Sequence, residues 1–158
     1  MASKPRKKSG KGRRPGYVDP DPLGRIRPLQ TPEVPMAQFG SALLSMTHGS
    51  NPSVEDWRIL ADLVNIIMAL SIEGGHMPWP QVKPLIDDAT EAMVNANRRH
   101  KGGGSIRLSG TGIKAMGELM ALFDECAQVL TAHEMRRARQ VAADLVNKKR
   151  DDPSAVVA

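Results

Sequence analysis

Apolar residues dominate the stretch from 54 to 72, and polar or small residues interrupt it at the spacing of a helix. We therefore expect a central helix with one narrow polar strip, which partner helices cover from two sides. Ser53 is the expected N-cap because its hydroxyl can accept a backbone N–H, and Gly74 with Gly75 is expected to end the helix. The positions of the polar strip are Glu55, Arg58, Asp62, Asn65, Ala69 and Glu73.

Other segments also carry apolar residues at helical spacing. They predict a short helix over residues 37–46, a helix from residue 81 or 84 to 100, and a helix over 112–130. Residues 105–108 alternate as a strand does, but they are too few to predict one, and we expect a loop. The predicted fold class is all-α, a small helical bundle of four main helices plus a short leading helix.

The last helix is expected to begin at Thr131 and to run to about residue 149. Thr131 and Glu134 have the spacing of a capping box, in which the threonine oxygen accepts a backbone N–H and the glutamate reaches back. A single kinked helix through residue 131 is the alternative. The expected inward positions are Met135, Ala138, Val141, Ala142, Leu145 and Val146.

Proline recurs throughout the first part of the chain and opposes regular structure there. We expect residues 1–35 to form a basic, proline-rich and largely disordered arm, residues 36–150 one helical domain, and residues 151–158 a short disordered tail. The less charged segment 17–34 leaves two possibilities open, a strap across the bundle or a mobile continuation of the arm.

The net charge of +5 is divided very unevenly along the chain. Residues 1–16 contain seven basic residues and no acidic one, which leaves 15 basic against 17 acidic residues and a charge of −2 for the rest. Long-range attraction for a polyanion must therefore come mainly from the N-terminus.

The basic N-terminus suits contact with the phosphates of DNA or RNA, since cations on a glycine-containing segment can follow a groove and release counterions. Tyr17 could stack on a base. A solvated tail that aids solubility and, in a eukaryotic host, a nuclear-localisation signal are the alternatives. The candidate nucleic-acid-binding residues of this segment are Lys4, Arg6, Lys7, Lys8, Lys11, Arg13 and Arg14.

A second basic group, Arg136, Arg137 and Arg139, lies near the start of the last predicted helix with His133 and Gln140. Cations are unfavourable at the positive end of a helix dipole, so their presence there is informative. They could contact phosphates, but no glycine turn of a helix-turn-helix precedes them, which argues against sequence-specific reading. Ordinary surface charge is the alternative.

Catalytic, metal and cofactor signatures are not found in the sequence. The glycines near residue 110 fit neither a phosphate-binding loop nor a dinucleotide fingerprint, and the four histidines are far apart with no HExxH motif. Cys126, the only cysteine, falls on an apolar stripe where an inert thiol is expected. We expect no enzyme activity, no cofactor, no bound metal, no signal peptide and no membrane span.

Several short motifs together carry a resemblance. They are KPRKK at residues 4–8, EDW at 55–57, an arginine-ended helix, RLSG at 107–110 and LTAHE at 130–134. With the proline-rich arm, this layout resembles a loose group of small helical proteins encoded in bacterial prophages. The resemblance implies a phage origin and assigns no activity and no site residue.

These observations predict a non-enzymatic, cytoplasmic accessory protein that binds DNA or RNA without sequence specificity through its arm. The alternative is a protein–protein module, an adaptor or inhibitor of a host factor. Its contact would be an exposed apolar patch near Met77, Trp79 and Val82, and the basic tail would be incidental.

Overall fold

The computed structural model describes residues 36–74 and 76–151. Every regular element in this part of the chain is a helix, so the predicted all-α class is confirmed. The expected arm over residues 1–35 and residues 152–158 of the expected tail lie outside the described residues. The elements are α1 (Met36–His48), α2 (Val54–Ala69), the π-helix η3 (Leu70–Gly74), α3 (Trp79–Lys101), α4 (Gly110–Ala127) and α5 (Ala132–Asp151).

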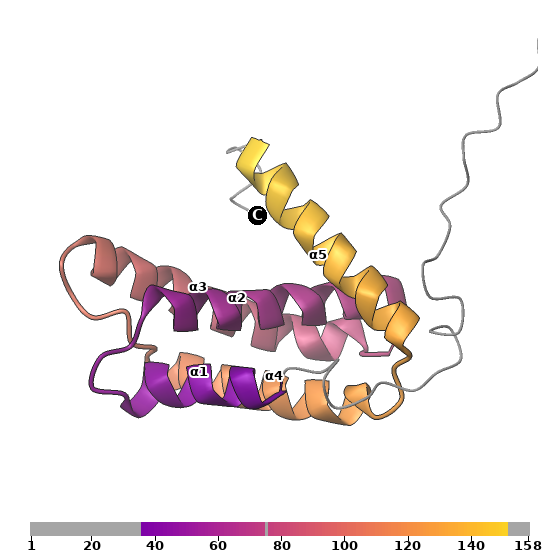
Figure 1. Ribbon diagram of the computed structural model, residues 1–158, viewed down its shortest axis with the longest axis horizontal. Coiled ribbons are helices and arrows are strands. Elements are labelled where there is room, and N and C mark those ends of the chain that lie inside the picture. Colours follow the sequence, from indigo (N-terminus) through magenta and orange to yellow (C-terminus); the bar gives the residue numbers. More distant parts are fainter. Residues whose placement is uncertain (1–35, 75, 152–158) are drawn as a thin grey trace, which may run out of the picture.

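Helix α2 is the centre of the molecule, as its apolar pattern predicts. It contacts α1, α3, α4 and α5, and its side chains Leu60, Leu63 and Ile67 have no solvent exposure. Figure 1 shows α1 and α4 as one layer and α2 and α3 as a second layer above it. The main contacts of α5 are with α2 and η3, so α5 covers one side of the central helix only.

Local hydrogen bonds fix the start of α2. Ser53 is the N-cap, as expected, and its hydroxyl accepts the N–H of Asp56 while the Asp56 carboxylate accepts the N–H of Ser53. The same carboxylate accepts a hydrogen bond of 2.7 Å from the hydroxyl of Ser45 in α1. One turn into α2, the indole N–H of Trp57 donates to the carbonyl of Met93 in α3 at 2.9 Å. The two bonds set α2 against α1 and α3.

The end of α2 differs from the sequence-based expectation. Ala69, which we assigned to the polar strip, is buried, because Ala138 of α5 lies against the same cavity and covers this part of the strip. From Leu70 onward the backbone forms a π-helix, whose wider turn changes the direction of the following side chains. Ile72 is consequently 59% exposed although it belongs to the apolar run.

Helix α3 begins at Trp79, earlier than predicted, with Pro78 as N-cap and Pro80 in the first turn, where proline is tolerated. This start bears on the exposed apolar patch that the alternative function would need. Val82 now faces the core and is 1% exposed, and Met77 is 4% exposed where the connector lies beside the end of α4. Trp79 is half-buried against the core. The surface postulated for an adaptor function is therefore not present.

Residues 105–108 form a loop, as predicted, and the loop is part of the core. Every second side chain of the loop faces the core, so Ile106 and Leu108 are buried. The N–H of Leu108 donates to the carbonyl of Met46 at the end of α1. Ser109 occupies the N-cap position of α4 without a side-chain bond, and α4 starts at Gly110, two residues before the expected start. The loop thus closes the end of the molecule where α1, α3 and α4 meet.

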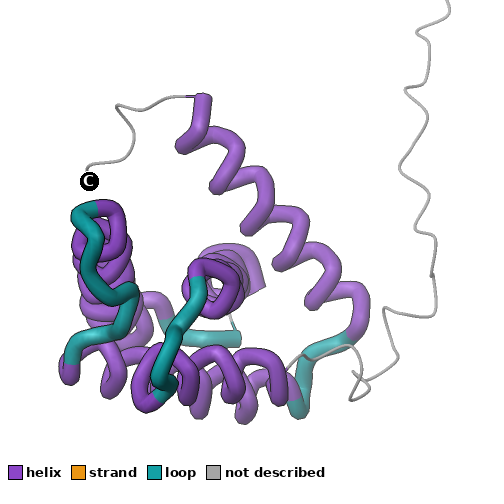
Figure 2. Tube along the Cα trace, turned by 60° about the vertical axis from the view of Figure 1, so that its left-hand side comes forward, coloured by secondary structure: helices purple, strands orange, loops and turns teal. Residues whose placement is uncertain are grey.

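Helix α5 is a separate helix, and the kinked alternative is wrong. Thr131 accepts the N–H of Glu134 at 3.2 Å, and the Glu134 carboxylate accepts the N–H of Thr131 at 2.8 Å, which is the expected capping box. Met135, Ala138 and Ala142 are buried as predicted, but Val146 is 47% exposed. Figures 1 and 2 show the reason, since α5 diverges from the other helices and its last turns leave the body of the protein.

Candidate nucleic-acid interface

The first half of α5 carries a cationic face. Ala132, Met135 and Ala138 anchor this half in the core, so the positions between them are directed outward. Arg137 and Arg139 are exposed, and Arg136 is half-buried. The structure therefore holds the second basic group found in the sequence on one rigid helix. The seven basic residues of the N-terminal segment lie outside the described residues.

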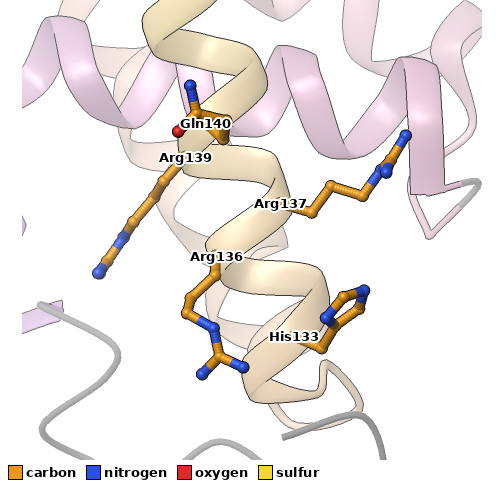
Figure 3. Close-up of a pocket in the computed structure, with 5 residues that line it drawn as sticks. All are labelled: His133, Arg136, Arg137, Arg139 and Gln140. Carbon is orange, nitrogen blue, oxygen red and sulfur yellow. The ribbon is translucent and has the colours of Figure 1, made fainter. Parts of the chain in front are cut away.

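A cavity of about 670 Å³ lies against this cationic face. Its described lining consists of His133, Arg136, Arg137, Arg139 and Gln140, and we call it the arginine cavity. Figure 3 shows Arg136 and Arg139 on one side of α5 and Arg137 reaching toward the other. All of these lining residues belong to α5, and the guanidinium groups among them favour an anion such as a phosphate.

The three arginines are not equivalent. The Nε of Arg137 donates to the Glu73 carboxylate of η3 at 2.9 Å, and this pair is exposed on both sides. Arg137 is therefore neutralised in part and braces α5 against the end of α2. Arg136 and Arg139 line the cavity from the other side of α5.

A groove of about 390 Å³ adjoins the arginine cavity between α2 and the diverging part of α5. Arg139 lines both. Asp62 is exposed, but partial desolvation, and secondly the charge of Glu55, raises its pKa above the ordinary value of 3.8. We call this the α2–α5 groove, and its lining is Asp62, Asn65, Ile66, Arg139, Ala142, Ala143, Val146 and Asn147.

The junction between the α2–α3 connector and α5 contains a hydrogen-bonded pair that the sequence does not reveal. His76 Nε2 lies 2.8 Å from Glu134 Oε1, although the residues are 58 positions apart. Burial alone would raise the pKa of Glu134, but hydrogen bonds from the Thr131 N–H, His76 and the Thr131 hydroxyl outweigh it and hold the pKa below 4.5. Glu134 thus caps α5 and ties it to the connector at the same time.

The described residues were also compared with the requirements of a metal site and of a reactive thiol. No group of three or more His, Cys, Asp or Glu side chains there could hold a metal ion. Cys126 is buried, as its apolar stripe predicts, and burial, followed by the charge of Glu134, raises the pKa of its thiol. A thiol with a raised pKa is a weak nucleophile at neutral pH.

None of the helices in the described ranges is both long enough and apolar enough to cross a membrane. Comparison of the whole chain with protein-family models, curated proteins and solved structures finds no match.

Proposed function

We propose that this chain is a non-enzymatic nucleic-acid-binding protein that holds DNA or RNA electrostatically and without sequence specificity. The separation of charge along the chain carries the proposal: seven cations and no acid in residues 1–16, against −2 in all the rest. Such a segment gains binding free energy by releasing the counterions condensed on phosphates. The principal contacts are Lys4, Arg6, Lys7, Lys8, Lys11, Arg13 and Arg14.

Helix α5 supplies the second contact in this proposal. The arginine cavity presents Arg136 and Arg139 from successive turns of one helix, so both can reach neighbouring phosphates. The core anchors of α5 hold them at a fixed spacing, which reduces the entropy lost on binding.

The resemblance of the sequence to prophage-encoded helical proteins suggests the setting. We place this protein among phage accessory proteins that act in the cytosol of the host cell. The body of the protein carries a slight negative charge, so nonspecific binding through a basic segment does not spread over its whole surface.

Fluorescence anisotropy with a labelled DNA duplex tests the proposal. If about five of the N-terminal cations meet phosphates, log K falls against log salt with a slope of roughly −4 to −5. A duplex of scrambled sequence is expected to bind equally well. Absence of binding by the full chain at low salt, or a salt slope near zero, contradicts the proposal.

A further inference from the structure

Basic residues gather where α3 ends and the loop to α4 begins. Residues 92–113 contain four cations and no acidic residue. Figure 1 shows this loop at the opposite end of the molecule from the start of α5, so the group is separate from the arginine cavity. We call it the α3–α4 basic end, and its residues are Arg98, Arg99, Lys101 and Arg107.

The end of α3 does not need these side chains as caps. Cations near a helix C-terminus commonly hydrogen-bond to its last carbonyl groups. Here the N–H groups of loop residues 102–104 donate to those carbonyls, which belong to Arg98, Arg99 and His100. Gly103 has a φ of +88°, a conformation that favours glycine and lets the loop turn back onto the helix. The donors of the cationic side chains therefore remain for other contacts.

The arginines of the basic end are held in place without being neutralised. Arg99 donates to the carbonyl of Arg107, and Arg107 donates to the carbonyl of Gly49 after α1. A carbonyl orients a guanidinium group but cancels none of its charge, and the group keeps further N–H donors. No cation of the basic end forms an ion pair with an acidic side chain of the described residues. Glu55 and Asp56, at the start of α2, are bound to other side chains.

We propose that the α3–α4 basic end binds the sugar–phosphate backbone of a nucleic acid, as a contact of the folded domain distinct from the N-terminal segment and from α5. This inference rests on the function proposed above and adds a surface to it. Arg98 and Lys101 are both exposed and lie three positions apart on one face of α3, so they can bind neighbouring phosphates. The exposed glycines at 102–104 have no side chains that would keep the partner at a distance.

The chemistry of this surface favours a nucleic acid over a lipid membrane. Residues 97–105 contain no apolar side chain. Helices that bind a membrane surface combine cations with apolar side chains that enter the lipid. Arginine, in contrast, matches the oxygens of a phosphate with paired N–H donors. Contacts of this kind do not read the bases, so no sequence preference is expected.

The test measures the anisotropy of a labelled DNA duplex with the full chain over a range of salt concentrations. Arg98→Gln combined with Lys101→Gln removes two exposed cations, of which Arg98 binds only Asn95 of its own helix. If both meet phosphates, the slope of log K against log salt becomes less steep by about 2. Lys83→Gln combined with Lys148→Gln removes two exposed cations elsewhere and is the matched control, which should keep the slope.

The outcomes separate this inference from the function on which it rests. A slope that flattens in the basic-end variant and not in the control supports the inference. Equal slopes for all three proteins, or equal flattening in both variants, overturn it and leave binding through the N-terminal segment in place. Absence of binding by the full chain at low salt overturns both.

Vesicles that contain phosphatidylserine provide the comparison with a lipid surface. The inference predicts that Arg98→Gln with Lys101→Gln changes duplex binding more than vesicle binding. Loss of vesicle binding in this variant, with duplex binding unchanged, would overturn the assignment to nucleic acid and assign the basic end to a membrane.

Discussion

Gly112 of α4 lies against Ala92 of α3 so closely that a Cβ atom on residue 112 would come within 2.1 Å of the Ala92 Cβ. Ala89 and Ala96, one turn away on either side of Ala92, are also fully or almost fully buried. The small side chains allow the two helices to approach closely along this seam. Close packing of α3 and α4 in turn joins the two layers of the molecule, since α4 belongs to one layer and α3 to the other.

Gly112→Ala should therefore destabilise the protein. The added methyl group overlaps the Ala92 side chain, and overpacking of this kind costs about 1 to 3 kcal/mol. Gly117→Ala is the matched control in the same helix, since nothing lies within 4 Å of its Cβ position. That control should raise the free energy of unfolding by about 0.5 to 1 kcal/mol through helix propensity alone. Chemical denaturation measures both, and equal effects of the two changes would contradict the close contact.

The core of α2 supports a second prediction. Leu63→Ala or Ile67→Ala should cost about 2 to 5 kcal/mol, the range for truncation of a buried aliphatic side chain. Arg58→Ala should cost little, because Arg58 is exposed and its pair with Glu55 lies at the surface. If denaturation ranked Arg58 as the most damaging of the three positions, the assignment of the polar strip would be wrong.

Glu134 should make stability depend on pH at the acidic end. Its pKa is lowered in the folded protein, so its contribution to stability is complete above the unfolded value of about 4.5 and is lost as pH falls through the folded pKa. Glu134→Gln should lower the thermal midpoint at neutral pH, and its difference from the wild type should shrink on acidification.

The contribution of Asp62 to stability should depend on pH in the opposite direction to that of Glu134, which makes Asp62 a control. Its pKa is raised, so its ionised form costs the folded state stability at neutral pH, and that cost disappears below about 3.8. Asp62→Asn should therefore raise the thermal midpoint at neutral pH and lose this advantage on acidification. Parallel pH profiles of the two variants would show that neither shift arises from the contacts described.

Trp79 is expected to be partly shielded from solvent, since it is half-buried against the core at the start of α3. In a Trp57→Phe variant, acrylamide should quench its fluorescence less than that of a short tryptophan peptide. Quenching as strong as in the peptide would instead show an exposed side chain and restore the adaptor hypothesis, which needs an apolar contact there.

Features that depend on neighbouring residues were predictable from the sequence. The caps at Ser53 and Thr131 are examples, because a cap needs only a hydroxyl and an N–H two or three positions away. The start of α3 was missed because prolines at 78, 80 and 84 permit a helix to begin at several positions.

Features of the candidate site that depend on the path of α5 could not be predicted. Contact of His76 with Glu134 joins residues 58 apart. The α2–α5 groove arises from the angle at which α5 leaves α2, and Val146 is exposed for the same reason. In the sequence, only the basic residues of α5 could be recognised as candidate site residues. Asp62 and Asn65 of α2, which line the same groove, could be recognised only as part of an ordinary polar strip.

Deletion of residues 1–16 tests the proposed function most directly. The deletion removes seven cations and leaves a chain of net charge −2, so binding to a generic duplex at low salt should collapse while the thermal midpoint stays nearly unchanged. The measurement is the anisotropy of a labelled duplex titrated with the full chain and with the truncated chain. Undiminished binding by the truncated chain would contradict the proposed role of the N-terminal segment and would move the principal contact to Arg136 and Arg139 on α5.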